Sequence, residues 1–73
     1  MNRLTQVIAE YNETKLEPGE PAMTQRRLAE LTGVHELTVH RHATRKTAID
    51  LDQAVAYARV LKVEIIELVE PAK

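Results

Sequence analysis

The segment of residues 36–43 carries side chains that could read the edges of DNA bases. Arg41 could donate a bidentate pair of hydrogen bonds to O6 and N7 of guanine, and Leu37 could cover a thymine methyl group. Glu36 could accept from a cytosine amino group while repelling the phosphates of wrong sequences. His40 would share its flank in a helix. We therefore interpret Glu36, Leu37, His40 and Arg41 as candidate base contacts.

A second set of polar and basic residues could contact the DNA backbone. Gln25 would open the preceding helix, where unpaired backbone N–H groups attract anions. Such contacts supply affinity and fix register without reading sequence. The candidate phosphate contacts are Gln25, Arg26, Arg27, Thr38, Arg45, Lys46 and Thr47.

Each candidate also has an ordinary structural interpretation. The three arginines of the two helices could be solvated charges, and Leu37 would be a core residue if its helix were rotated. Thr38 could bond only the helix backbone. His42 falls on the inward side with Val39, so we expect it to pack in the core.

Metal binding and catalysis are not indicated. His35, His40 and His42 lack the i, i+4 spacing that places two imidazoles on one helical face, and the chain has no cysteine. No nucleophile lies in a recognisable arrangement with a base, and there is no glycine-rich phosphate loop. We expect a protein that is not an enzyme and needs no cofactor.

Two short amphipathic helices must position the candidate residues. Periodicity predicts them at residues 25–31 and 36–43, with apolar sides formed by Leu28, Ala29 and Thr32 and by Val39, His42 and Ala43. Thr24 is the expected N-cap of the first helix and His35 that of the second. Gly33 suits the left-handed residue that ends the first helix. So tight a turn predicts a helix-turn-helix, with its core at residues 24–44.

Three further helices are expected outside this segment. Asn2 would cap the first, which carries Leu4, Val7, Ile8 and Tyr11 on one stripe and ends between residues 12 and 16. Asp50 or Asp52 would cap another, with Leu51, Val55, Ala58 and Leu61 inward. Residues 63–69 form the last helix before Pro71, although their β-branched content leaves a strand conceivable.

The prolines of residues 17–23 predict a flexible surface loop. An arm that contacts a partner or the minor groove is the alternative, but the two glutamates of this segment would repel phosphate. We therefore expect an ordinary connecting loop.

Composition bounds the class of protein. The chain has 73 residues, no cysteine and two tyrosines as its only aromatics, so its core must consist of aliphatic side chains. We expect one all-α domain spanning residues 1–73, a compact bundle of about five short helices. No apolar run approaches the ~18 residues of a membrane span and no signal peptide is visible, which favours a soluble, cytoplasmic protein.

Charge is unevenly distributed. The net charge is −1, yet residues 24–48 carry five Lys or Arg against two Glu, an excess of +3. Each flanking segment carries −2. A basic segment in an otherwise acidic domain is a modest electrostatic footprint of nucleic-acid binding.

The pattern Thr24-Gln25-x-x-Leu28-Ala29-x-x-Thr32-Gly33-Val34, followed by Thr38-Val39-x-Arg41, resembles the helix-turn-helix of phage-repressor-like (Xre/Cro-type) transcriptional regulators. The resemblance covers roughly residues 24–70. It implies a lambda-repressor-like DNA-binding domain in which Gln25 and residues 45–47 contact phosphates and Glu36, Leu37 and Arg41 contact bases. The chain departs from the family in its longer loop at residues 17–23, in His35 as a cap, and in Ala43-Thr-Arg where Glu-x-Gly is common.

These features lead to one expected function and one alternative. We expect a sequence-specific regulator that binds double-stranded DNA, most simply a repressor. The alternative is a protein-interaction module such as a small antitoxin-like protein. The resemblance also implies a homodimer paired through the C-terminal helix, whose candidates are Ile65, Ile66, Leu68 and Val69, although these residues could equally close the monomer core.

Overall fold

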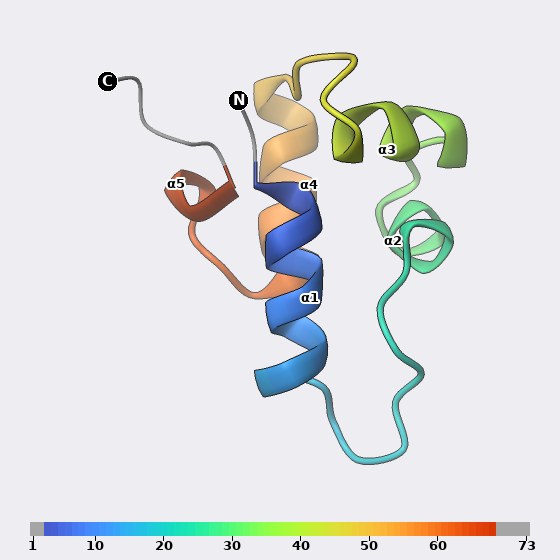
Figure 1. Cartoon of the computed structure of the whole chain (residues 1–73), viewed down its shortest axis with the longest axis vertical. Coiled ribbons are helices and arrows are strands. Elements are labelled where there is room, and N and C mark those ends of the chain that lie inside the picture. Colours follow the sequence, from blue (N-terminus) through green and yellow to red (C-terminus); the bar gives the residue numbers. More distant parts are fainter. Residues whose placement is uncertain (1–2, 69–73) are drawn as a thin grey trace.

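The computed structural model describes residues 3–68, which form five helices and no strand (Figure 1). The prediction of an all-α chain of about five short helices is confirmed. The helices are α1 (Leu4–Thr14), α2 (Gln25–Thr32), α3 (Glu36–Ala43), α4 (Leu51–Leu61) and α5 (Ile65–Leu68).

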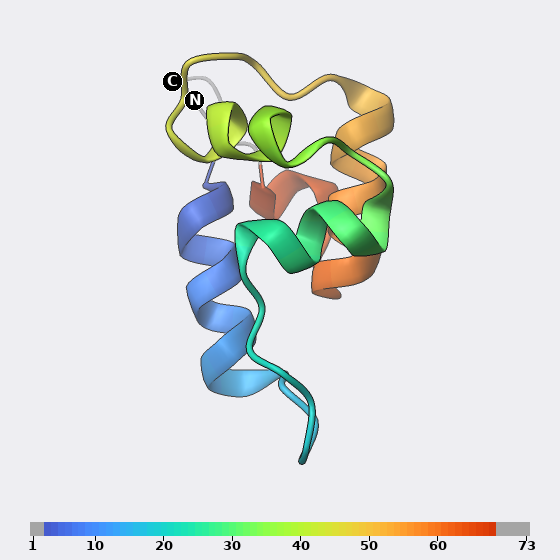
Figure 2. The same cartoon turned by 90° about the vertical axis from the view of Figure 1, so that its right-hand side faces the viewer.

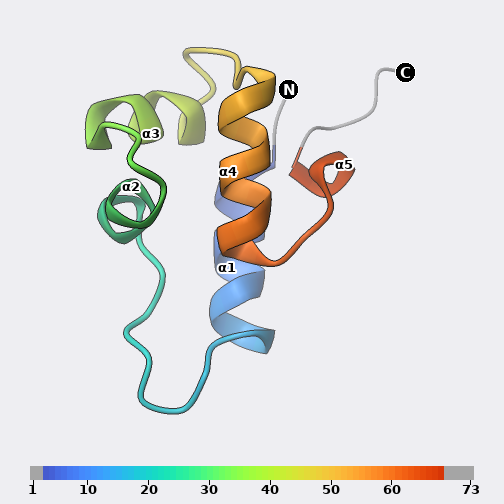
Figure 3. The same cartoon turned by 180° about the vertical axis from the view of Figure 1, so that it is seen from behind.

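Helices α1 and α4 form the centre of the molecule. Figure 3 shows them between α2 and α3 on one side and α5 on the other, the same order as in Figure 1. Every helix sends side chains into one core, whose largest buried members are Tyr57, Leu4, Leu28, Leu61, Leu68, His42, Val7 and Val39. The core is mainly aliphatic, as the composition requires.

Helix α1 buries the stripe that its periodicity predicts. Leu4, Val7 and Tyr11 are buried, and Ile8 is half-buried beside them. The helix begins at Leu4 with Arg3 in the N-cap position, one residue later than predicted. Asn2, the predicted cap, lies outside the described residues.

Helix α4 turns a different face inward from the one predicted. Leu51 is 70% exposed and Val55 is only half-buried, whereas Ala54, Tyr57, Ala58 and Leu61 are buried. The predicted face and the buried face of α4 share Ala58 and Leu61. The burial of the large Tyr57 side chain therefore determines which of the two faces points inward. Burying an aromatic ring whose hydroxyl finds a partner is more favourable than burying Leu51. The predicted inward position of Leu51 was wrong, whereas the Asp50 cap is confirmed, since its Oδ1 accepts from the Gln53 N–H at 3.0 Å.

The predicted loop at residues 17–23 is anchored to α1 at Glu20 and Met23. The Asn12 amide donates to the Met23 carbonyl at 3.0 Å and accepts from the Met23 N–H at 2.7 Å. The Tyr11 hydroxyl donates to Glu20 at 2.6 Å, and Met23 is buried in the core. Figure 2 shows this loop projecting from the end of the molecule opposite α3. It therefore does not lie beside the candidate base contacts.

Helix α5 closes the core over the start of α1. Leu68 is fully buried, and its carbonyl accepts a hydrogen bond from the Arg3 N–H at 2.6 Å. Burying such a side chain stabilises a fold by roughly 1.5–3 kcal/mol. Leu68 is therefore a core residue rather than a pairing residue, whereas Ile65 and Ile66 are exposed. Val69 and Pro71 lie outside the described residues, and the strand considered for residues 63–69 does not form over Ile65–Leu68.

None of the helices within residues 3–68 combines the length and the apolar character that crossing a membrane requires.

Candidate nucleic-acid interface

The connection between α2 and α3 is built by three local contacts. Thr24 caps α2, because its Oγ1 accepts from the Arg27 N–H at 3.0 Å. Gly33 ends α2 in the left-handed conformation, with φ +78°, and its N–H donates to the Ala29 carbonyl at 2.9 Å. His35 caps α3 through Nδ1, which accepts from the Leu37 N–H at 3.1 Å. All three predicted end residues are thus confirmed, and α3 begins three residues after Gly33.

The inner face of α3 lies in the core and contacts α4 through His42. Val39 is fully buried and His42 is 1% exposed, as predicted. A hydrogen bond of 2.7 Å joins Nδ1 of His42 to the Tyr57 hydroxyl, and the two rings meet edge to face at 5.6 Å. Burial lowers the pKa of His42 and raises the pKa of Tyr57 to about 12. Both side chains are therefore uncharged at neutral pH.

The outer face of α3, defined as Glu36, Leu37, His40 and Arg41, is exposed along the whole helix. Leu37 keeps 50% of its surface in contact with solvent, so its interpretation as a core residue was wrong. The Arg41 guanidinium makes no hydrogen bond or ion pair within residues 3–68. The four candidate base contacts thus occupy one accessible surface.

Helix α2 brings Gln25 next to this surface. Nδ1 of His40 lies 3.0 Å from Oε1 of Gln25, and both residues line a shallow hollow with His35, Glu36 and Leu37. Gln25 therefore lies at the start of α2 and at the edge of the outer face of α3. Gln25 is a candidate phosphate contact whose side chain is hydrogen-bonded to the side chain of a candidate base contact.

The two arginines of α2 differ in their surroundings. Arg26 is exposed and forms an ion pair of 3.8 Å with Glu30, an arrangement that contributes little to stability. Arg27 is half-buried, and its Nε is enclosed without a hydrogen-bond partner in the described part of the chain. The positive charge of Arg27 has a lowering effect on the pKa values of the Tyr11 hydroxyl and the Glu20 carboxyl. Arg27 is thus directed toward the loop side of α2. Thr38, on α3, is half-buried.

The segment after α3 forms a Schellman ending. The Lys46 N–H donates to the Arg41 carbonyl at 2.9 Å, and the Arg45 N–H donates to the His42 carbonyl at 3.1 Å. Arg45 occupies the left-handed position with φ +65°, where glycine would avoid about 1–2 kcal/mol of strain. Arg45, Lys46 and Thr47 are exposed directly after the helix.

Sequence reasoning missed two residues that position α3. Tyr57 holds His42, and Thr5 of α1 donates from Oγ1 to the Ala43 carbonyl at 3.2 Å. A tyrosine spaced with alanines on one helical stripe is a signal for the first, because a buried hydroxyl needs a partner. The contact of Thr5 joins residues 38 positions apart, and no local pattern indicates it.

No group of three or more His, Cys, Asp or Glu side chains that could hold a metal is found within residues 3–68. Comparison of the chain with protein-family models, with curated proteins and with solved structures gave no significant match. Function is therefore inferred from the chemistry of α2 and α3 alone.

Proposed function

We propose that the chain is a sequence-specific double-stranded DNA-binding transcriptional regulator that acts as a repressor. In this proposal, α2 and α3 form a helix-turn-helix and α3 enters the major groove. The observation that carries it is the outer face of α3. This face exposes a carboxylate, an imidazole, an apolar side chain and an arginine, while Val39 and His42 hold the opposite face in the core.

Each side chain of the outer face matches a feature of a major-groove edge. Arg41 can bond guanine O6 and N7 together, Leu37 can cover a thymine methyl, and Glu36 can accept from a cytosine amino group. A good bidentate contact is worth about 1–3 kcal/mol of discrimination between bases. These contacts would supply the sequence preference.

Backbone contacts would come from both ends of the helix pair. Gln25 opens α2 beside free backbone N–H groups, and the exposed Arg45, Lys46 and Thr47 follow α3. The excess of +3 in residues 24–48, against −2 in each flanking segment, favours approach of DNA by this side. Arg27 and Thr38 are half-buried. We therefore expect weaker phosphate contacts from these two residues than from the exposed ones.

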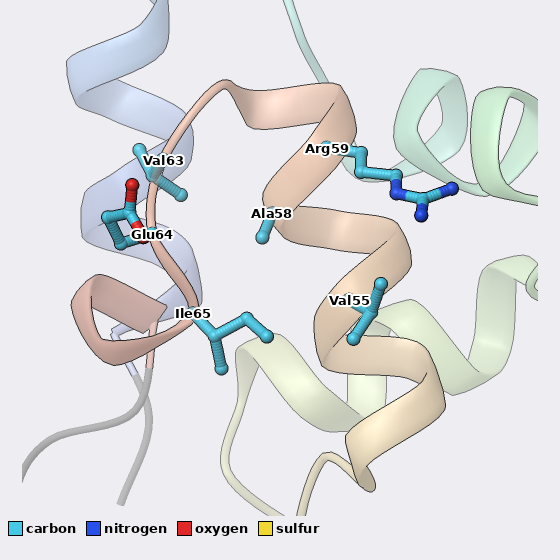
Figure 4. Close-up of a pocket in the computed structure, with 6 residues that line it drawn as sticks. All are labelled: Val55, Ala58, Arg59, Val63, Glu64 and Ile65. Carbon is cyan, nitrogen blue, oxygen red and sulfur yellow. The ribbon is translucent and has the colours of Figure 1, made fainter.

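Pairing of two copies would match a repressor that binds a two-fold symmetric site. The candidates are Ile65, which is 36% exposed, and Ile66, which is 68% exposed. Ile65 lines a groove between α4 and α5 together with Val55, Ala58, Arg59, Val63 and Glu64, and within it the Val55 and Ile65 side chains face each other (Figure 4). In this proposal, the two copies of α3 in a homodimer each read one half of a two-fold symmetric site.

The alternative is a cytoplasmic protein-interaction module, such as a small antitoxin-like protein. The same groove, whose lining combines apolar side chains with Arg59 and Glu64, favours it, as does the overall charge of −1. In that case the groove between α4 and α5, rather than the outer face of α3, would be the binding surface.

A salt series separates the two functions. Affinity for a labelled duplex is measured by fluorescence anisotropy at several salt concentrations between about 50 and 200 mM. DNA binding predicts a linear fall of log affinity with log salt, with a slope near −0.9 for each phosphate contact. A negligible slope would remove the DNA proposal and leave the interaction module.

A further inference from the structure

A single hydrogen bond joins the start of α2 to the middle of α3. It runs from Nδ1 of His40 to Oε1 of Gln25 over 3.0 Å. His40 is exposed and Gln25 is half-buried. The bond therefore fixes the orientation of an accessible ring on the outer face of α3.

This bond also determines which nitrogen of the ring carries the proton. A carboxamide oxygen only accepts hydrogen bonds, so Nδ1 of His40 must donate to Oε1 of Gln25. In the neutral ring the other nitrogen, Nε2, then bears a lone pair and acts as an acceptor. Within residues 3–68, Nε2 of His40 has no hydrogen-bond partner. An acceptor is thus left available on the outer face.

The flank of the outer face of α3 that carries His40 differs from the rest of the face in the hydrogen bonds that it can form. Glu36 lies one turn before His40, at the i, i+4 spacing that brings two side chains together, and its carboxylate also offers acceptors. Arg41 offers only donors. In the major groove, the groups that donate are the amino groups of adenine and cytosine. The flank of Glu36 and His40 therefore complements amino groups.

We propose that Gln25 holds His40 so that its Nε2 accepts a hydrogen bond from the amino group of adenine or cytosine in the major groove. This rests on the proposed DNA-binding function and adds the identity of the bases that this flank reads. Guanine and thymine present only acceptors on their own major-groove edges, so they would face the lone pair of Nε2.

Gln25 also links this reading to the DNA backbone. Its carboxamide nitrogen carries two N–H donors that have no partner among the described residues. Those donors lie at the first turn of α2, where phosphates bind favourably. Oε1 would thus orient His40 while the amide nitrogen holds a phosphate, which makes Gln25 a positioning residue for His40.

The state of the ring is tested first on the protein alone. Nitrogen-15 NMR of the histidine rings at about pH 8 should show His40 in the neutral form protonated at Nδ1. In Gln25→Leu, which removes the acceptor and leaves an apolar side chain one atom shorter, this form should give way to the one protonated at Nε2. A wild-type His40 protonated at Nε2 would overturn the inference irrespective of DNA binding.

Base preference is tested next with duplexes selected by the wild-type protein from a random library. Gln25→Leu and His40→Ala should each lose about three- to tenfold of the preference for adenine or cytosine at one position, the value of one hydrogen bond. The double variant should lose no more than His40→Ala. Lys46→Ala, the matched control, should weaken all duplexes alike, and thermal melts verify that each variant folds.

The outcomes separate the two proposals. If the wild type binds selectively but both variants keep the base preference, the inference about His40 is overturned and the proposed function stands. If the wild type shows no selective, salt-dependent binding, the proposed function fails and this inference fails with it.

Discussion

Nδ1 of His42 lies 2.7 Å from the Tyr57 hydroxyl, so the helix that carries the outer face is joined to α4 by a polar contact inside the core. Both side chains are almost completely buried, and their rings also pack edge to face. An apolar contact tolerates small rotations, whereas a buried hydrogen bond is directional. Together with the burial of Val39 and the bond from Thr5 to the Ala43 carbonyl, this contact sets the rotation of α3 and so which residues face outward.

The buried imidazole predicts a loss of stability in mild acid. Burial lowers the pKa of His42 below the ordinary value of 6.5, although Asp50 opposes part of the shift. The unfolded chain then binds a proton more readily than the folded one, so this contribution is complete above pH 6.5 and is lost as the pH falls below it. Urea unfolding at about pH 7.5 and about pH 5.5 should give a lower free energy of unfolding at the acidic pH.

Two variants test whether His42 causes this loss of stability in mild acid. His40→Gln should keep this pH dependence, since its side chain is exposed, whereas His42→Asn should reduce it. NMR titration of the His42 ring in the intact protein gives the same answer without a substitution. A His42 pKa at or above 6.5 would contradict the assignment.

The turn between α2 and α3 predicts a cost for any side chain at Gly33. Its φ of +78° disfavours residues that carry a Cβ, although a Cβ placed there would meet no atom within 4 Å. Gly33→Ala should therefore lower the free energy of unfolding by about 1–2 kcal/mol through backbone strain alone. Gly33→Asn should cost less, because asparagine tolerates this conformation. Equal losses in both variants would indicate a steric clash instead.

Arg41 and Lys46 should affect DNA binding in different ways. Arg41→Ala should relax the preference at one base pair, with a loss of about 1–3 kcal/mol on the preferred duplex. Lys46→Ala should weaken all duplexes similarly and reduce the salt slope by about one. Affinities for a panel of single-base variants measure both effects. An unchanged preferred sequence in Arg41→Ala would show that Arg41 does not read a base.

Exposed isoleucines predict self-association through α5. Ile66 is 68% exposed, so Ile66→Lys should leave the fold intact but weaken a homodimer by at least about tenfold. Sedimentation at several concentrations measures this change. Leu31→Lys, at a residue of α2 that is 47% exposed, is the matched control. A wild type that stays monomeric at all concentrations, or a control that dissociates equally, would contradict pairing through α5.

The parts of the structure that were predictable from the sequence depend on local chemistry. Thr24, Gly33 and Asp50 end or begin helices through contacts within a few residues, and the inward position of His42 follows from helical periodicity. Leu51 was misplaced because two stripes of α4 were nearly equivalent in apolar character. The choice between them depends on Tyr57 and on its partner in another helix.

In the candidate site, too, some features follow from local sequence patterns and others depend on contacts between helices. A helical wheel is sufficient to place Leu37 and Arg41 outward once Val39 is inward. The bond between Gln25 and His40 joins two helices, so it depends on how α2 and α3 cross. The burial of Met23 likewise requires the whole loop to fold back on α1.

Selection of duplexes from a random DNA library by the full chain tests the central claim most directly. If the outer face of α3 reads the major groove, one sequence motif should be enriched. Arg41→Ala should then enrich a motif that has lost its preference at one guanine. Failure of the wild type to enrich any motif at moderate salt would contradict the claim that this protein is a sequence-specific DNA-binding regulator.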